Sequence, residues 1–328
     1  MARGIFGLDR VYKKQVQNIK DDNFESWPES ATYGYFGGAD SPSVATVDRI
    51  DFSNETTSAP GNNLTQARGG LAAVSSSSYG YFGGGTPSVT TIDRIDFSNE
   101  TTSPVTATLP EGRYRLAALS SSSYGYFGGG IPTITGLISR IDFSNETTSA
   151  PGNNLPQPRT NLAACSSSSY GYFGGGYTGG VPFDDVATID RIDFSNETTS
   201  APGDNLPQPR SGLAAVSGGA SQRIKGSRTY GYFAGGSPSP DGRIDRIDFS
   251  NETTSAPGEN LPQPRTNLAA VSSSSYGYFG GGSAPPQVDK IDRIDFSNET
   301  TSAPGNNLSQ ARNSLAAVSS SSYGYFGG

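Results

Sequence analysis

Apolar and polar residues alternate along this chain in short blocks that recur many times. In one block, residues 92–97 read Ile-Asp-Arg-Ile-Asp-Phe, so that Asp93, Ile95 and Phe97 share one face of an extended chain. A period of two residues is the pattern of a β-strand. The spacing of three and four apolar residues that marks an amphipathic helix is not found anywhere in the sequence. We therefore predict an all-β protein.

Each recurring unit predicts four short strands. Residues 71–74 form an apolar run, a serine-rich turn follows, and residues 79–84 resume as an aromatic strand that ends in a glycine pair. Two such runs around a short turn predict a hairpin. Residues 92–97 are a third strand, and the polar, proline-bearing segment after Ser98 suits an outermost strand, because such residues protect an exposed sheet edge. Four short strands per unit predict the blade of a β-propeller.

The phrase Tyr-Gly-Tyr-Phe repeats at a nearly constant spacing. Its seven copies are about 46 residues apart, with one interval of 60. They begin at Tyr33, Tyr79, Tyr124, Tyr170, Tyr230, Tyr276 and Tyr323. A fixed period of this length indicates stacked copies of one supersecondary unit. We expect residues 1–328 to form a single propeller domain, with the repeats spanning residues 33–328.

Counting the strands leads to a prediction of seven blades. The seven aromatic strands are accompanied by six copies of the third strand. Residues 8–12, Leu-Asp-Arg-Val-Tyr, match the third-strand pattern, and residues 15–19 are read as the strand that follows. We therefore expect residues 1–20 to supply the closing strands of the last blade, which would remove free sheet edges. The alternative is a half-blade exchanged between subunits.

The unit resembles a kelch repeat. Arg68, the apolar strand 71–74, the aromatic strand with its glycine pair, 79–84, and the strand 92–97 match the kelch pattern in order. The tryptophan of that pattern is missing, since Trp27 is the only one in the chain. Residues 92–99 and their copies also resemble kelch-like structural proteins of marine tailed bacteriophages. This resemblance implies a virion component of the tail-fibre or capsid-decoration type.

The chemistry available to the chain argues against an enzyme. It contains no histidine, which excludes Ser-His-Asp and Cys-His arrangements and imidazole metal sites. Asp48 and Asp51 point to opposite faces of a strand, so they do not converge; we expect Asp48 to accept hydrogen bonds from the backbone or from an arginine. Cys165 stands where other copies carry valine and is expected to be a buried apolar residue. We predict no catalytic residue, no metal site and no cofactor; carboxylates acting in a central channel are the enzymatic alternative.

The charge and hydropathy of the chain argue against binding to nucleic acid and insertion into a membrane. The net charge of −7 is spread evenly over the repeats, and no basic patch for nucleic acid is present. The sequence contains no run of 18 consecutive apolar residues, so we predict no insertion into a membrane. The N-terminal residues lack the apolar segment of a secretory signal, so the six Asn-Glu-Thr sequences are read as turn residues rather than glycosylation sites. Together with the resemblance, these features predict localisation in a virion that is assembled in the host cytoplasm.

The loops between second and third strands differ from copy to copy, and binding residues are usually found on loops of a rigid scaffold. They span residues 39–46, 85–91, 130–137, 176–188, 237–243 and 282–290. The candidate binding residues are Tyr177, Phe183, Asp184 and Asp185 in the longest of these loops, and Arg223, Lys225 and Arg228 in an extended hairpin at the opposite end. We predict a non-enzymatic protein that contacts other virion proteins and a host receptor or glycan. The alternative is an intracellular kelch-type module for protein–protein interaction.

Overall fold

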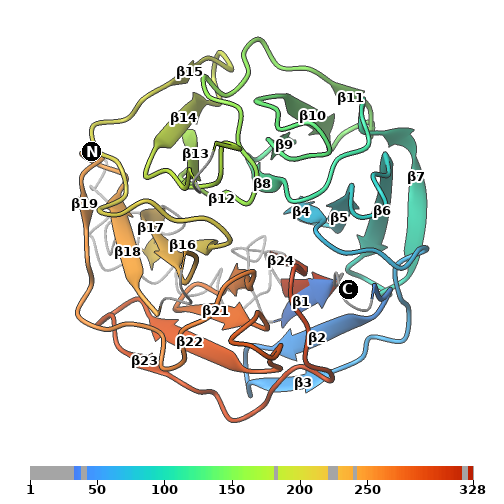
Figure 1. The fold of residues 1–328 in the computed structure, drawn as a ribbon. Helices are drawn as coiled ribbons and strands as arrows, with labels where there is room; N and C mark the ends of the chain where they lie inside the picture. Colours follow the sequence, from blue (N-terminus) through green and yellow to red (C-terminus); the bar gives the residue numbers. More distant parts are fainter. Residues whose placement is uncertain are drawn as a thin grey trace, which may run out of the picture.

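The strands of the chain are arranged as sheets around a central axis (Figure 1). The computed structural model describes residues 33–37, 43–180, 184–220, 228–238, 242–319 and 324–327. Within these ranges the secondary structure consists of β-strands and turns, as the alternating pattern predicts. The β-propeller with repeated blades is thus confirmed.

Five sheets have four antiparallel strands each, and in each of them the chain runs from the axis outward. The first comprises β4 (Ala72–Ser75), β5 (Tyr79–Gly83), β6 (Thr91–Asp96) and β7 (Thr102–Thr108). The second comprises β8 (Ala117–Ser120), β9 (Tyr124–Gly128), β10 (Ile138–Asp142) and β11 (Thr148–Ser149). The third comprises β12 (Ala163–Ser166), β13 (Tyr170–Gly174), β14 (Ile189–Asp193) and β15 (Thr199–Ser200). The fourth comprises β16 (Ala214–Ala220), β17 (Arg228–Ala234), β18 (Ile244–Asp248) and β19 (Thr254–Ser255). The fifth comprises β20 (Ala269–Ser272), β21 (Tyr276–Gly280), β22 (Ile291–Asp295) and β23 (Thr301–Ser302).

The remaining strands form one sheet that joins the two ends of the described chain. It contains β1 (Tyr33–Gly37), β2 (Val47–Asp51), β3 (Thr56–Ser58), β24 (Ala316–Ser319) and β25 (Gly324–Gly327). The prediction of seven blades is therefore wrong: the described strands make five regular blades and this one further sheet. The error arose because two copies of the aromatic strand, β1 and β25, lie in the same sheet. Residues 8–19, which were expected to close the ring, lie outside the described part of the chain.

The glycines of the aromatic strand allow neighbouring blades to pack closely. A Cβ on Gly80 would lie 2.8 Å from Val318 Cγ2 in the adjacent sheet, and a Cβ on Gly83 would lie 2.8 Å from the ring of Phe127 in the next blade. Between these glycines, Tyr81 is fully buried and stacks on Phe143 with 5.5 Å between ring centroids. Any side chain at the glycine positions would separate the blades. Glycine at these positions therefore permits the close approach of neighbouring blades.

Each blade is also fastened to its neighbour by a glutamate in the turn between third and fourth strands. Glu146 has a φ of 56° and accepts hydrogen bonds from Tyr81 Oη at 3.0 Å and from Arg94 Nη1 at 2.8 Å. The preceding Asn145 accepts the backbone N–H of Thr147 at 3.0 Å, which confirms its role as a turn residue. Equivalent ion pairs join Arg49 to Glu100, Arg140 to Glu197, Arg191 to Glu252, Arg246 to Glu299 and Arg293 to Glu55. The last of these pairs connects the fifth blade to the sheet of the chain ends.

A circle of backbone hydrogen bonds closes the propeller at its axis. One residue just before each innermost strand has a φ between 53° and 63°, and its N–H donates to the carbonyl of the equivalent residue in the neighbouring sheet at 2.6–2.9 Å. The six residues are Gly70, Arg115, Asn161, Gly212, Asn267 and Ser314. The bond from Gly70 N to Ser314 O, 2.7 Å long, completes the circle. The innermost ring therefore has sixfold, not sevenfold, connectivity.

Candidate functional site: the loop rim

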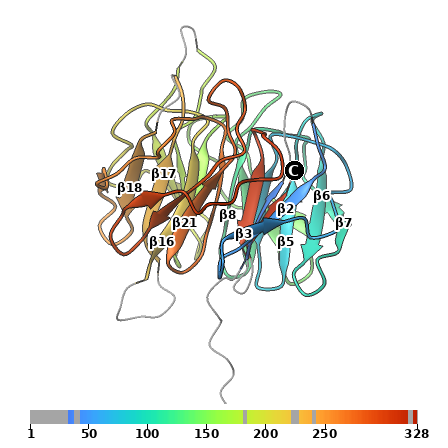
Figure 2. The same ribbon diagram turned by 90° about the horizontal axis from the view of Figure 1, so that it is seen from below.

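The loops between second and third strands lie at one end of the propeller, which we call the loop rim (Figure 2). The hairpins between first and second strands and the turns that carry the glutamates lie at the other end, the hairpin rim. In the five regular blades, each loop begins at a glycine pair with positive φ, such as Gly84 at 74° and Gly85 at 117°. Glycine adopts this conformation without a steric penalty because it has no Cβ. The glycine pair therefore directs the chain out of the sheet and into the loop.

In four of the five regular blades, a buried arginine holds the two ends of this loop together. Arg68 Nη1 donates to the carbonyl of Gly84 at 2.7 Å and to that of Thr91 at 2.8 Å. One nitrogen therefore bridges the two ends of the loop formed by residues 85–90. Arg159 Nη1 makes the same two bonds to Gly175 at 2.8 Å and Thr188 at 2.7 Å, although its loop is much longer. The geometry at the base is thus independent of loop length. Such a scaffold accepts different loops without a change to the blade beneath.

The guanidinium groups are buried among charges and carbonyls. Arg68 and Asp93 are fully buried, and their side chains form an ion pair at 2.8 Å. Burial lowers the pKa of Arg68, and the charge of Asp93 opposes that shift. Asp48 forms the equivalent pair with Arg312 and accepts a hydrogen bond from Ser309 Oγ at 2.7 Å. The expected structural role of Asp48 is therefore confirmed.

The longest loop is folded back on itself and brings three of the candidate residues together. Tyr177 pairs with Asp185 through a β-bridge, and its hydroxyl donates to the carbonyl of Gly180 at 3.2 Å. The carbonyl of Asp184 accepts the N–H of Thr178 at 3.1 Å, which leaves the Asp184 side chain exposed. Tyr177 and Asp185 are half-buried. The backbone pairing of residues 177 and 178 with residues 184 and 185 thus brings an aromatic residue and two carboxylates to one place on the loop rim.

The loop of residues 176–188 also packs against the loop of the preceding blade, residues 130–137. A Cβ on Gly179 would lie 2.8 Å from Ile134 Cδ1, in the loop of the preceding blade. The two loops therefore form a continuous surface. The other candidate residues do not join it: Phe183, Arg223 and Lys225 lie outside the described residues, and Arg228 belongs to β17 at the hairpin rim. The extended hairpin itself is confirmed by the seven-residue strands β16 and β17.

The centre of the loop rim carries polar side chains that the sequence analysis did not single out. They belong to the circle of backbone hydrogen bonds: Arg115 is exposed, and Asn161, Asn267 and Ser314 are half-buried. The guanidinium of Arg115 also lies 5.9 Å from the ring centroid of Tyr114. A signal was present in the sequence, because glycine and asparagine recur two residues after the buried arginine and both tolerate positive φ.

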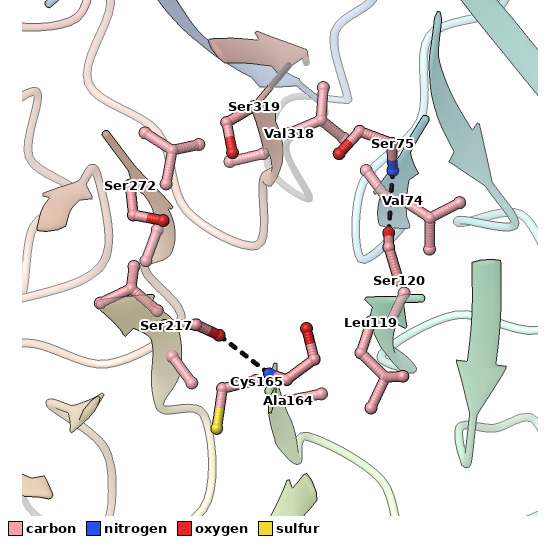
Figure 3. A pocket seen from close by; sticks show the side chains of 18 residues that line it. Val74, Ser75, Leu119, Ser120, Ala164, Cys165, Ser217, Ser272, Val318 and Ser319 are labelled. Atoms are coloured by element: carbon pink, nitrogen blue, oxygen red, sulfur yellow. Dashed lines mark hydrogen bonds between the residues drawn. The ribbon is translucent and has the colours of Figure 1, made fainter. Parts of the chain in front are cut away.

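The channel below this circle is lined by uncharged side chains (Figure 3). Its volume is about 100 Å³, and each of the six innermost strands contributes an alanine, a serine and one valine, leucine or cysteine. The N–H of Ser75 donates to Ser120 Oγ at 3.0 Å, and that of Ser166 donates to Ser217 Oγ at 2.8 Å. Cys165 is 3% exposed, as expected for an apolar residue. The carboxylates that a channel enzyme would need are not among these lining residues.

In the described ranges, no group of three or more acidic or cysteine side chains is placed to hold a metal ion. No helix long and apolar enough to cross a membrane is found in the same ranges. No family model matches the chain, and no curated protein is similar to it.

Proposed function

We propose that this chain is a non-enzymatic binding protein that presents its loop rim to a host receptor or glycan. One observation carries the proposal: Arg68 and Arg159 hold loops of very different length on identical bases, with hydrogen bonds of 2.7–2.8 Å in both blades. The sequence and length of the loops vary at the loop rim, where a partner can bind, whereas the strands of the blades beneath are nearly identical. This is the arrangement by which rigid scaffolds diversify binding.

The chemistry of the longest loop fits a sugar. The aromatic ring of Tyr177 offers an apolar face for stacking, and the exposed carboxylate of Asp184 can accept hydrogen bonds from sugar hydroxyls. The exposed guanidinium of Arg115 near the axis adds a site for an acidic group on a longer glycan. The ligand class we propose is therefore an oligosaccharide that spans from the rim toward its centre.

The finer proposal is that the protein is a structural component of a virion, of the tail-fibre or capsid-decoration type. It rests on the resemblance of residues 92–99 and their copies to kelch-like phage proteins. Other virion proteins would then be its structural partners. Mass spectrometry of purified virus particles from the source organism tests this point, and absence of its peptides from pure particles contradicts it.

A glycan array tests the binding proposal. We expect the wild-type chain to bind a limited set of oligosaccharides, and Tyr177→Ala and Asp184→Asn to weaken that binding about tenfold or more, which corresponds to about 1.4 kcal/mol. Asp184→Asn preserves the loop because the loop bonds use the carbonyl of that residue. Ser122→Ala, at an exposed position of the hairpin rim, is the matched control and should bind like the wild type. Equal signals over all sugars, or equal loss in the control, would refute the proposal.

A further inference from the structure

The sheet of the chain ends contains two copies of the same strand. β1 and β25 belong to identical stretches, Tyr-Gly-Tyr-Phe-Gly at residues 33–37 and 323–327. In each of the five regular blades, one such strand lies between the innermost strand and the third strand. The sheet of the chain ends has one innermost strand, β24, and one third strand, β2.

β1 pairs as a regular second strand on both of its edges. Against β2 it pairs Tyr33 with Asp51 and Gly37 with Val47, as β5 pairs Tyr79 with Asp96 and Gly83 with Ile92. Against β24 it pairs Gly37 with Ala316, as β5 pairs Gly83 with Ala72 in the first blade. The register of β1 is therefore that of a complete second strand.

β25 has the same register against the same two strands. It pairs Gly327 with Ala316 and Tyr325 with Val318 of β24. It also pairs Gly327 with Val47 and Phe326 with Asp48 of β2. β1 and β25 run parallel to each other, so both present the same chain direction to their neighbours. Both strands thus have the pairing register of the second strand of this sheet, between β24 and β2.

That position accommodates one strand at a time. A β-strand pairs along two edges, and β2 uses its other edge for β3, pairing Arg49 with Ser58. The other edge of β24 faces the axis, as do those of the remaining innermost strands around the channel. One edge of β24 and one edge of β2 therefore serve two candidate strands.

We propose that the second-strand position of this sheet is an exchangeable acceptor site for an extended Tyr-Gly-Tyr-Phe-Gly segment, filled in turn by β1 and by β25. The two segments have the same sequence and the same neighbours in the sheet, so the two closed forms differ little in free energy. Populations of similar size follow from such a small difference. The strand that is not paired remains tethered next to the site.

The ring stays closed while the strands exchange, because other contacts join the two ends of the chain. Arg312 pairs with Asp48, and Arg293 pairs with Glu55 at 2.5 Å. Thr57 Oγ1 donates to the carbonyl of Asn307 at 2.6 Å. None of these residues belongs to β1 or β25. The exchange therefore needs only the local opening of one strand.

Blocking one strand at a time tests the proposal in the full-length chain. In the regular blades, a Cβ at the glycine between the two tyrosines would collide with the preceding blade, as at Gly80 and at Gly277, both 2.8 Å from a valine methyl. Gly34→Leu should therefore exclude β1, and Gly324→Leu should exclude β25. Each single variant should keep nearly the wild-type unfolding midpoint, because the other strand fills the site.

Hydrogen exchange provides a readout that does not depend on stability. In the wild type, amides of residues 33–37 and 324–327 should both exchange faster than those of β5, since each strand is unpaired for a large share of the time. Gly324→Leu should then slow the exchange of β1 to the rate of β5, and Gly34→Leu should slow that of β25. If β1 is fully protected in the wild type and unaffected by Gly324→Leu, or the reverse for β25, the proposal is wrong.

The double variant and a peptide measure the acceptor site directly. Gly34→Leu with Gly324→Leu should lower the midpoint by more than the sum of the single effects. A labelled Tyr-Gly-Tyr-Phe-Gly-Gly peptide should bind this variant and raise its midpoint, whereas Tyr-Leu-Tyr-Phe-Gly-Gly should not. Additive single effects, or equal binding of both peptides, would contradict the exchange. If the double variant does not fold, the exchange rates of the single variants decide the question.

Discussion

The first two regular blades differ in the environment of their buried arginine. In the blade of β4–β7, Arg68 pairs with the carboxylate of Asp93 at 2.8 Å. In the blade of β8–β11, Arg113 donates to the hydroxyl of Ser139 at 2.7 Å. Both arginines nevertheless hold a loop base: Arg113 Nη1 bonds the carbonyls of Gly129 at 2.7 Å and Leu137 at 2.8 Å. The position of the guanidinium is therefore set by the backbone carbonyls and does not depend on the ion pair.

A second difference accompanies the first. Asp93 also accepts a hydrogen bond from Thr65 Oγ1 at 2.5 Å, whereas Pro110 stands at the equivalent position before Arg113. Proline has no N–H and no hydroxyl, so no donor is left there without an acceptor. Burial lowers the pKa of Arg113 to about 10, opposed by the charge of Glu111. A buried cation without a partner carboxylate lowers the free energy of unfolding. The blade of β8–β11 folds in spite of this destabilisation by Arg113.

Removal of the carboxylate from the first blade should have the largest effect. Asp93→Ala leaves Arg68 buried without a counter-ion and Thr65 without its acceptor, which we expect to lower the free energy of unfolding by about 3–5 kcal/mol. Urea denaturation measures the change. Gln157→Ala, at an exposed position, is the control and should stay within about 0.5 kcal/mol of the wild type. A similar loss for Ser139→Ala would show that the two blades do not differ as we infer.

Addition of a carboxylate to the second blade should have the opposite sign and a smaller size. The blade of β12–β15 combines Pro156 with the ion pair of Arg159 and Asp190, so Ser139→Asp is compatible with Pro110. We expect a gain of about 1–3 kcal/mol in the free energy of unfolding. Ser139→Asn, which adds a similar volume without the charge, is the control. A gain of the same size from asparagine would attribute the effect to packing.

The gain from Ser139→Asp should depend on pH. The pKa of Arg113 in the folded chain, about 10, lies below its ordinary value of 12.5, so the unfolded chain binds its proton more tightly. The destabilisation is complete below pH 10 and is relieved as the pH rises above that value. The stability difference between Ser139→Asp and the wild type should therefore be constant up to about pH 10 and then shrink. Denaturation curves from pH 8 to pH 11 measure it; a difference that grows with pH contradicts this reasoning.

The smallest effect concerns a feature that the two blades share. Burial raises the pKa of Tyr81 and of Tyr126, and hydrogen bonds to Glu146 and Glu197 add to the shift. This contribution to stability is present below pH 10 and is lost as the pH rises further. Tyr81→Phe and Tyr126→Phe should each cost about 1 kcal/mol at neutral pH and each weaken the alkaline loss. Unequal costs would show that the difference between the blades extends beyond the arginine.

Much of the blade could be predicted from the sequence because its determinants are local. Alternation in residues 92–97 predicted the third strand, and β6 covers Thr91–Asp96. The Asn-Glu-Thr sequences were also interpreted correctly as turn residues, as the bond from Thr147 N–H to Asn145 shows. Tyr177, Asp184 and Asp185 were placed on one rim because loop position follows from strand order. The polar side chains around Arg115 were missed because they meet only across different blades.

The sequence by itself determined the repeating unit: four strands, a glycine pair that starts a loop, and an arginine near a carboxylate or hydroxyl. These features depend on residues within about one repeat of each other. The number of units that close the ring could be read only from the fold, because closure depends on β2 and β24, from opposite ends of the chain, joining one sheet. Seven identical aromatic strands were counted as seven blades, yet β1 and β25 have the register of a single position. Local pairing rules admit either strand there, and the ring has room for one.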